Sequence, residues 1–372
     1  IMENPFVIQG YQGKEYFCDR QDEIQALENH IVNNRNITVY GWRRLGKTSL
    51  IQYLAEEIKE KHTIETLFVD ISTCRNYDNL KTTFFQAVFH KFGKTRQGGI
   101  KKAFQKIIAS LGVSLSFDPL SGLPTFSFQL QENEDKERSL SQLFHFLNQL
   151  NSEILIVFDE FQQVQNIEKA EMEASLRNFT QIFPQLRFLF SGSHRGIMQS
   201  MFTSSNRPFY RSTQLIELRP IDNATYAKFI YDHFKNHNKN ISTDLINQIY
   251  QWSRGETYCI QLICNYLFSS SNSVVQQDFI KTKESILQQF HGYFAELLNL
   301  LTNKQVAVLK SIAKNEPVQN PTSQSFIKSN NLGAASSVQS ALKALQEKEI
   351  IFKENSCFFV HDVLLSQWLK IN

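Results

Sequence analysis

The sequence predicts an α/β protein: a three-layer sandwich on a mostly parallel sheet, followed by a small helical domain and a C-terminal winged helix. Three observations lead to this prediction. Short apolar runs alternate with helical patterns up to Pro220, helical patterns alone follow, and three helices with two strands close the chain. With 372 residues the chain is long enough for two or three such domains.

Five short runs rich in β-branched or aromatic residues are expected to be strands. Several of them are nearly continuous apolar runs, which is typical of strands buried on both faces of a parallel sheet. Helical patterns such as Ser49–Lys61 and Met172–Phe183 lie between them. This alternation predicts that ligands bind at the carboxyl ends of the strands. The runs are Asn36–Tyr40, Thr66–Ile71, Ile154–Phe158, Arg187–Phe190 and Gln214–Leu218.

A stretch at about residues 79–138 interrupts the alternation. It contains two helical patterns and then two strand-like alternations joined by a turn-rich segment, which predicts a helical insertion ending in a β-hairpin. A polar loop is expected to follow at Gln131–Arg138. The helical patterns are Leu80–Phe92 and Ile100–Leu111, and the strand-like alternations are Val113–Phe117 and Thr125–Leu130.

After Pro220 the next segments have helical periodicity. A longer amphipathic pattern, with apolar residues at three- and four-residue spacing from Ile286 to Leu301, follows three shorter helices. The shorter helices are Ala224–Lys235, Thr243–Ser253 and Thr257–Phe268. The predicted domains are a core at 1–220 with its insertion at about 79–138, a helical lid at 221–300 and a winged helix at 301–372.

The last domain has the element order of a winged helix. Thr302, with Gln305 three residues later, forms a capping box that predicts a helix to about Lys314. Two more helices and a hairpin follow, an order that is a variant of helix-turn-helix. These elements are expected at Ser323–Ser329, Ala334–Gln346, Glu349–Lys353 and Cys357–His361.

Composition argues against several classes of protein. The formal net charge of +3 and the hydrophobic share of 42% are ordinary, so neither disorder nor a polyanion-coating protein is indicated. The five cysteines are an odd number without a CxxC pair, which argues against a disulfide framework or a structural zinc site. No apolar run approaches the roughly 20 residues of a membrane helix, and the first residues lack a signal-peptide pattern. We therefore expect a cytoplasmic protein with no membrane partner.

The segment Gly41-Trp-Arg-Arg-Leu-Gly-Lys-Thr48 is a complete GxxxxGK[ST] motif between a predicted strand and a predicted helix. Glycines let the main chain wrap around phosphate oxygens, and the helix N-terminus adds positive potential. Lys47 is expected to reach the β- and γ-phosphates, and the Thr48 hydroxyl to ligate Mg²⁺. The predicted core is therefore a P-loop NTPase. Its expected nucleotide contacts are Gly41, Trp42, Arg43, Arg44, Leu45, Gly46, Lys47, Thr48 and Ser49.

Two acids, Asp159 and Glu160, follow the apolar run that begins at Ile154. Alone they would be ordinary loop residues. With a P-loop upstream, Asp159 is the expected partner of Mg²⁺, in the Walker-B role. Glu160 is expected to act as the general base that polarises the attacking water. A second acid directly after the first favours hydrolysis of ATP over simple storage of the nucleotide.

Further polar residues are candidates for contact with the γ-phosphate. Ser193, slightly preferred to Ser191, ends the next strand, where a hydroxyl is able to hold the attacking water; a capping turn is the alternative. Arg211 precedes the last strand and is a candidate arginine finger, in this subunit or a neighbouring one, with a surface salt bridge as the alternative. Arg43 and Arg44 add positive charge to the loop, and for Arg43 a solvated surface position is preferred.

The winged helix leaves its target open. From Leu301 to Asn372 there are eight Lys, no Arg and five acids, so the segment is only slightly basic. The expected recognition helix carries Lys343 with Ser and Gln side chains, and it lacks the arginines that read guanine edges or clamp phosphates. DNA and protein are therefore both retained as partners, and a packing module is the third alternative.

With these motifs in hand, the chain resembles the prokaryotic archaeal-type ATPases of the AAA+ and STAND branch of P-loop proteins. The segment Tyr16-Phe-Cys-Asp-Arg-Gln-Asp-Glu23 is similar to the box that opens these proteins. The resemblance continues through GWRRLGKTSL, FDEFQ, SGS and the run from Phe209 to Pro220, and it covers most of the chain in order.

The resemblance implies an ATPase core, a helical lid and a winged helix, arranged as in the origin-recognition initiator ATPases. It implies that Arg20 lies near the adenine or braces the lid, and that Arg211 is the family's arginine before the last strand. One departure is clear. Thr257 stands where many relatives have a lid proline, and no second-sensor arginine follows unless Arg254 serves.

Together these observations predict a slow, Mg²⁺-dependent ATPase that switches conformation between core, lid and winged helix. ATP, ADP and Mg²⁺ are the expected ligands, with a nucleotide-dependent oligomer where an arginine must arrive from a neighbour. The alternative is a nucleotide-stabilised module that binds DNA or protein with little hydrolysis. A small-molecule kinase shares the P-loop but explains neither Asp159-Glu160 nor the winged helix.

Overall fold

The computed structural model describes residues 4–93, 113–117, 124–128, 134–150, 152–167 and 171–372. The chain divides into two compact units. One is Gly10–Arg219, and the other joins Ile1–Gln9 to Pro220–Asn372. Each unit is described by itself below. No helix in the described part of the chain has the length and apolar character needed to cross a membrane.

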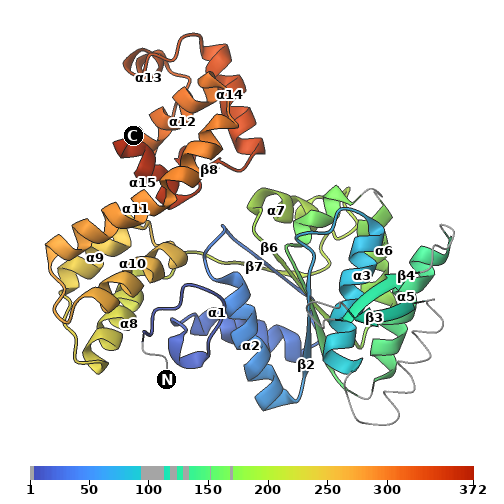
Figure 1. Cartoon of the computed structure of the whole chain (residues 1–372). Helices are drawn as coiled ribbons and strands as arrows, with labels where there is room; N and C mark the ends of the chain where they lie inside the picture. The colour runs from blue at the N-terminus through green and yellow to red at the C-terminus, as the bar shows by residue number, and fades with distance from the viewer. Residues whose placement is uncertain (1–3, 94–112, 118–123, 129–133, 151, 168–170) are drawn as a thin grey trace. The chain divides into compact units, whose positions relative to one another are not determined.

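The first unit is built on a parallel five-stranded sheet (Figure 1). Its strand order is β2-β5-β6-β1-β7, and every neighbouring pair is parallel. The five strands predicted from the sequence are therefore confirmed. They are β1 (Ile37–Tyr40), β2 (Glu65–Asp70), β5 (Ile154–Asp159), β6 (Arg187–Gly192) and β7 (Gln214–Glu217).

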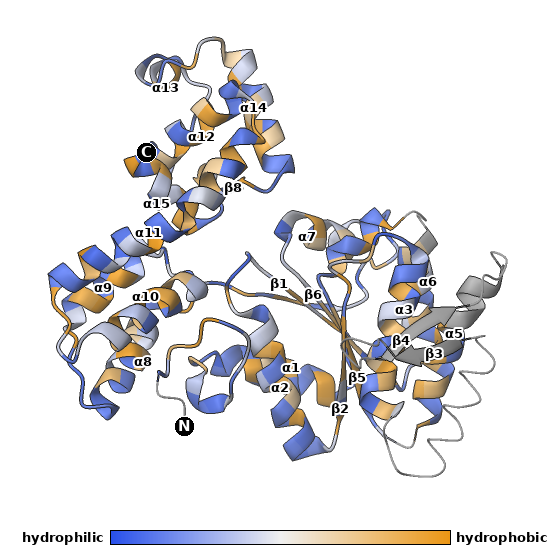
Figure 2. Cartoon of the chain, viewed as in Figure 1, coloured by the Kyte–Doolittle hydropathy of each residue, from blue (hydrophilic) through white to orange (hydrophobic). Residues whose placement is uncertain are grey.

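Helices cover both faces of this sheet, which completes the predicted three-layer sandwich. α1 (Gln21–Val32) and α2 (Lys47–His62) turn their apolar residues toward one face (Figure 2). α3 (Tyr77–Val88), α5 (Glu134–Gln149) and α6 (Glu171–Ile182) lie on the other, and α7 (Arg195–Thr203) contributes to the same core. Residues of β5 alternate between the two cores, which explains why this strand is apolar throughout.

The insertion follows β2. After α3 come a π-helix, η2 (Phe89–Gly93), and an antiparallel hairpin of β3 (Val113–Phe117) and β4 (Pro124–Phe128). The first helical pattern and the hairpin are confirmed, whereas the pattern at Ile100–Leu111 lies outside the described residues. The prediction of a polar loop reaching Arg138 is wrong, because α5 already begins at Glu134. Acidic residues in a first helical turn interact favourably with the helix dipole, and the polar sequence concealed this start.

The second unit begins with a helical bundle. Its helices are α8 (Asn223–Asn236), α9 (Thr243–Trp252), α10 (Thr257–Ser270) and α11 (Gln276–Asn299). Phe6, fully buried, packs against Phe229, Phe234 and Phe268 of this bundle, and Asn4 bonds to the carbonyl of Asn265. Asn4 and Phe6 therefore pack with these helices, although the core was predicted from the sequence to include residues 1–220.

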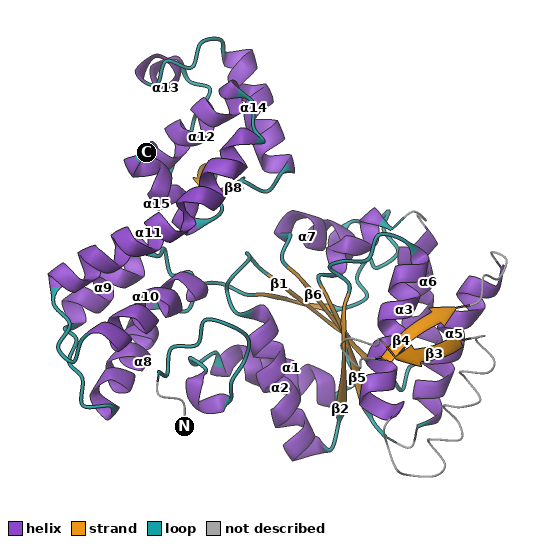
Figure 3. Cartoon of the chain, viewed as in Figure 1, coloured by secondary structure: helices purple, strands orange, loops and turns teal. Residues whose placement is uncertain are grey.

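The C-terminal part has the predicted winged-helix order, with one further helix at its end (Figure 3). The Thr302–Gln305 capping box is present at the start of the first helix. Val318 bridges to Phe358 and extends the β8–β9 hairpin. The elements are α12 (Asn303–Asn315), α13 (Gln324–Ser329), α14 (Ala335–Glu347), β8 (Ile351–Glu354), β9 (Cys357–Val360) and α15 (Val363–Ile371).

A buried carboxylate connects the helical bundle to the winged helix. Glu316, whose side chain is 4% exposed, pairs with Arg254 from the α9–α10 turn at 3.1 Å and with Lys370 of α15 at 3.2 Å. It also accepts from the Ser366 hydroxyl and from the amide of Val360. Arg254 donates in addition to the carbonyl of Val360. These contacts lie within one compact unit, so bundle and winged helix are held together.

Removing this carboxylate should destabilise the second unit. Glu316→Ala leaves a partly buried guanidinium and a buried amide without their acceptor, at a cost of roughly 3 kcal/mol. Urea unfolding followed by tryptophan fluorescence in a Trp42→Phe background reports this unit, because Trp252 and Trp368 both belong to it. Glu347→Ala, which removes the exposed partner of Lys343, should change stability by less than about 0.5 kcal/mol. Equal effects of the two variants would contradict the connecting role.

Candidate functional site

The phosphate-binding loop runs from the end of β1 to the start of α2. A Cβ atom on Gly41 would lie 2.5 Å from the carbonyl oxygen of Leu218, so only glycine fits there. Gly46 has a φ of 85° and precedes Lys47, the first residue of α2. Between these two glycines, the side chain of Leu45 is buried in the core that the sheet forms with α1 and α2, and Trp42 packs against the same core. These side chains anchor the loop to the core.

Lys47 is held inside this loop. Its side chain donates to the carbonyl of Gly41 at 3.0 Å and to that of Trp42 at 2.7 Å, and the residue is 6% exposed. Burial lowers the pKa of Lys47 to about 8, although the carboxylates of Glu160 and Asp159 raise it in part. The ammonium group is therefore poised between protein carbonyls, where a phosphate would satisfy it better.

Thr48 and Asp159 form the pair expected at a magnesium site. The Thr48 hydroxyl donates to the Asp159 carboxylate at 3.0 Å, and the other carboxylate oxygen accepts from the amide of Glu160. Mg²⁺ prefers oxygen ligands and binds through one or two protein groups together with substrate phosphates. Within the described residues no cluster of three or more His, Cys, Asp or Glu side chains is placed to hold a metal. The donor set therefore fits Mg²⁺ bound together with a nucleotide.

Glu160 lies beside this pair in a network of its own. Its φ of 54° is left-handed, which turns the chain at the end of β5. The Ser193 hydroxyl donates to the Glu160 carboxylate at 2.7 Å, and the Gln162 amide donates to the same oxygen. Ser191, by contrast, is buried within β6. Gln162 was missed by sequence reasoning, since no motif rule marks a residue two positions after the second acid.

Arg20 is placed behind the loop. It is 4% exposed and donates to the carbonyls of Leu45 at 2.9 Å and Arg219 at 3.0 Å, with Glu23 as its ion partner. The resemblance implied a place near the adenine or a brace for the lid. In the structure the guanidinium joins the phosphate loop to Arg219, the last residue of the first unit.

The arginines around the loop differ in their surroundings. Arg43 and Arg44 are exposed at the loop, and Ser49 is half-buried in the first turn of α2. Arg195, at the start of α7, lies 5.6 Å from the centre of the Trp42 ring and pairs with Glu217 at 2.6 Å. Sequence reasoning did not select Arg195, because only the fold brings the start of α7 beside the loop.

Arg211 lies near the amino ends of the strands, whereas the phosphate loop lies at their carboxyl ends. The chain after Arg211 leads into β7, whose first residue, Gln214, pairs with Ile37, the first residue of β1. The phosphate loop follows Tyr40, the last residue of β1, and therefore lies at the other end of the strands. Its amide donates to the carbonyl of Phe202 near the end of α7. Arg211 is exposed, and its guanidinium stacks on the ring of Tyr210. The structure therefore does not bring Arg211 to the phosphate loop of its own subunit.

Two family models match the chain. Residues 17–263 match an ATPase domain found predominantly in Archaea, and residues 292–371 match a probable winged helix domain. The first match covers more than half of the chain, so the protein belongs to this archaeal-type ATPase family. Its parallel sheet and its P-loop are those of a P-loop ATPase fold. The search of curated proteins found no match.

Solved structures share the whole architecture at low identity. The Walker-type ATPase paby2304 of Pyrococcus abyssi is 18% identical with a TM-score of 0.68, over 98% of this chain and 99% of that one. The Aeropyrum pernix ORC2 protein, in ADPNP–ADP complexes, is 15% identical with a TM-score of 0.60, over 99% and 95%. The Aeropyrum pernix ORC1 protein, in complex with DNA, is 13% identical with a TM-score of 0.55, over 100% and 97%. These likenesses establish a common fold.

The lowered pKa of Lys47 gives a pH dependence of stability. Because its folded pKa of about 8 lies below the ordinary 10.5, the unfolded chain binds more protons between these values. Raising the pH through this interval should therefore stabilise the fold, by up to roughly 3 kcal/mol. Melting temperatures of nucleotide-free protein in EDTA should rise for the wild type relative to Lys47→Met. Parallel pH curves for the two proteins would contradict the buried, desolvated lysine.

Proposed function

We propose that this chain binds ATP together with Mg²⁺, hydrolyses it slowly, and uses the nucleotide state to change the arrangement of core, lid and winged helix. The observation that carries the proposal is the Thr48–Asp159 hydrogen bond directly beside Lys47 and Glu160. A P-loop lysine, a magnesium-ligand pair and a second acid within one site are the parts that ATP hydrolysis requires.

Each part has a defined task in this proposal. The loop amides and Lys47 bind the β- and γ-phosphates, replacing the carbonyls of Gly41 and Trp42 as partners of the ammonium group. Thr48 and Asp159 hold Mg²⁺, which neutralises charge that develops on the phosphates. Glu160 accepts the proton of the attacking water.

Ser193 and Gln162 act through Glu160 as positioning residues. Both donate to the Glu160 carboxylate, which fixes the direction in which this base points. A general base contributes to the rate only within hydrogen-bond reach of the proton that it removes. Ser193 is thus the better of the two serine candidates for a role in hydrolysis.

The position of Arg211 supports the proposal of slow turnover. In its own subunit this residue lies at the amino ends of the strands, so an arginine finger from Arg211 has to serve a neighbouring copy in a nucleotide-dependent oligomer. A finger supplied in trans is worth several orders of magnitude in rate, which an isolated subunit lacks.

The route from nucleotide to lid begins at Arg20. This buried guanidinium bonds both to the carbonyl of Leu45 in the phosphate loop and to that of Arg219, directly before the second unit. A shift of the loop on ATP binding therefore acts on the segment that leads into the lid. A switch requires that the two arrangements bind ATP and ADP with different affinity.

A DNA target for the winged helix is the second candidate. It is supported by the winged-helix family match and by the shared fold with a protein solved in complex with DNA. The exposed residues of α14 include Ser336, Gln339 and Lys343, a weakly charged surface that fits a protein partner equally well. Duplex binding that weakens steeply with salt would favour DNA. We also propose that the protein belongs to the STAND branch of P-loop proteins and that it is cytoplasmic.

The decisive test is Mg²⁺-dependent phosphate release from ATP by the full chain, compared with Lys47→Ala and Glu160→Gln. The wild type should turn over slowly, Lys47→Ala should lose ATP binding, and Glu160→Gln should bind ATP without hydrolysing it. Glu296→Gln, an exposed site on α11, is the matched control and should keep the wild-type rate. Wild-type rates in Glu160→Gln would remove Glu160 from catalysis. ATP binding without turnover in every protein would favour the binding module.

Ser193→Ala should lower kcat by about tenfold or more while leaving the affinity for ATP unchanged, because the hydroxyl orients the base instead of binding the nucleotide. Ser193→Thr, which keeps the hydroxyl, should retain more activity than Ser193→Ala. Single-turnover rates and equilibrium binding of a fluorescent ATP analogue separate the two effects. A loss of affinity with unchanged kcat would place Ser193 at the phosphates.

A further inference from the structure

Among the described residues, β2 is an edge strand of the sheet in the first unit. This strand is outermost in the sheet order, and among the described residues it pairs with β5 alone. The amide of Glu65 donates to the carbonyl of Glu153, just before β5, so the odd-numbered residues of β2 face β5. Main-chain groups alternate in direction along a parallel ladder. The N–H and C=O groups of Thr66 and Phe68 therefore point away from β5.

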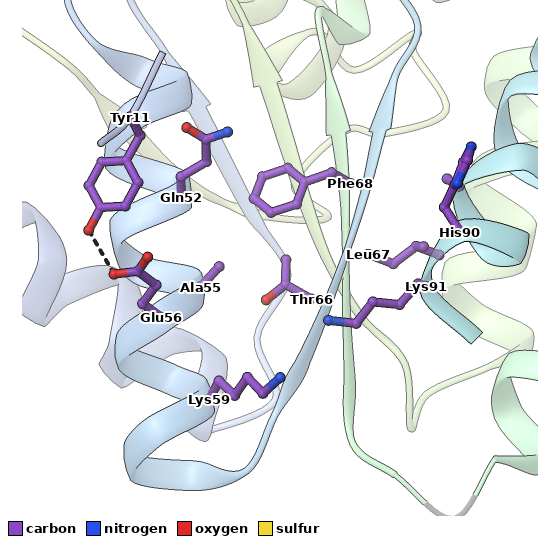
Figure 4. Close-up of a pocket in the computed structure, with 11 residues that line it drawn as sticks. Tyr11, Gln52, Ala55, Glu56, Lys59, Thr66, Leu67, Phe68, His90 and Lys91 are labelled. Atoms are coloured by element: carbon purple, nitrogen blue, oxygen red, sulfur yellow. Dashed lines mark hydrogen bonds between the residues drawn. The ribbon is translucent and has the colours of Figure 1, made fainter. Parts of the chain in front are cut away.

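A groove of about 640 Å³ runs along this edge (Figure 4). One wall is α2, which contributes Gln52, Glu56 and Lys59, and the other is the end of α3 with η2, which contributes His90 and Lys91. Figure 4 shows β2 between the two walls, with side chains from both directed toward it. The groove therefore lies along β2, between these two walls.

Two polar atoms in the groove have no partner in the described part of the protein. Thr66 is 7% exposed, and its hydroxyl makes no hydrogen bond. The side-chain carbonyl oxygen of Gln52 is likewise buried and unpaired. Both residues line the groove, and burying such groups unpaired is unfavourable. A bound group with hydrogen-bond donors would satisfy both.

Positive charge gathers at the amino end of β2. Lys59 and Lys91 approach the same carboxylate, Glu65, at 3.4 and 2.5 Å from opposite walls. Two ammonium groups share one carboxylate at this end, whereas Glu56, which also lines the groove, accepts from the Tyr11 hydroxyl farther along. Farther along, the ring of Phe68 is 36% exposed at the groove and offers an apolar contact.

We propose that this groove binds an extended segment of a partner protein, which adds to the sheet as a strand beside β2 and places an acidic side chain near Lys59 and Lys91. Strand addition uses main-chain hydrogen bonds for affinity and alternate side chains for specificity. The walls of α2 and η2 stand on either side of the edge. They admit one extended chain and keep out the edge of a second sheet with its covering helices, which argues against pairing of two copies.

A phage-displayed library of random peptides, selected on the nucleotide-free full chain, provides the probe. The selected peptides should be extended, with an acidic residue toward one end, and a synthetic copy should bind in a fluorescence anisotropy assay. Phe68→Pro removes an outward N–H group without removing a bond to β5, and proline is tolerated on edge strands. It should weaken binding by about tenfold or more, whereas Phe68→Ala, which keeps the N–H, should weaken it less.

Leu215→Pro is the matched control on the other edge of the same sheet. The amide of Gln214 donates to Asn36, next to β1, so that of Leu215 points outward at β7. This variant should bind the peptide like the wild type. Hydrogen exchange on the wild type gives a readout independent of any variant, because the peptide should slow exchange within residues 65–70 and leave 214–217 unchanged.

Three results would overturn the proposal. These are a failure to select any peptide, equal binding by Phe68→Pro and the wild type, and protection that falls outside β2. Dimerisation of the free chain that Phe68→Pro abolishes would also overturn it, in favour of a second copy as the occupant. None of these measurements involves ATP, so their outcome is separate from that of the proposed hydrolysis.

Discussion

The register of the parallel sheet is the constraint on which the site depends. Tyr40 at the end of β1 pairs with Gly192 at the end of β6, and Phe158 of β5 pairs with Phe190 of β6. The carboxyl ends of these strands therefore lie together, and they carry the phosphate loop, the Walker-B acids and Ser193. A slip of one residue would turn every side chain of a strand to the opposite core, and both cores are fully packed. The packing of the two cores thus fixes the positions of the site residues at the carboxyl ends of the strands.

Within that frame every reactive group of the site already has a protein partner. Lys47 bonds to loop carbonyls, Thr48 to Asp159, and Glu160 to Ser193 and Gln162. A buried ammonium group or carboxylate without a partner would be strongly destabilising, so this network stabilises the shape of the loop. In the proposed mechanism, nucleotide binding exchanges some of these bonds for bonds to phosphate. The same exchange explains how a phosphate is able to alter contacts beyond the loop, since each displaced carbonyl or hydroxyl must find another partner.

Whether a feature of the fold or the site could be predicted from the sequence depended on how far apart in the sequence its interacting residues lie. The P-loop, Asp159 with Glu160 and the Thr302–Gln305 cap are local patterns, so the sequence predicted them and the fold in which they occur. The two carbonyl acceptors of Arg20 lie 25 and 199 residues away in the sequence, so no local pattern names them. Gln162 and Arg195 carry no motif, and only packing brings them to the site. The place of Arg211 is a consequence of strand direction, because a residue before a parallel strand lies at the amino ends of the strands, opposite the phosphate loop.

The connection between the two units limits what a nucleotide-driven switch is able to move. The main chain passes between them after Gln9 and after Arg219, and the second passage is bonded through Arg20 to the phosphate loop. Beyond it, the ion pair of Glu316 with Arg254 ties the lid helices to the winged helix, so this arginine is engaged within its own unit. In the proposed switch, lid and winged helix therefore respond together as one body. In the proposed switch, this ion pair would carry the signal from the lid helices to the winged helix without an arginine of the second-sensor type.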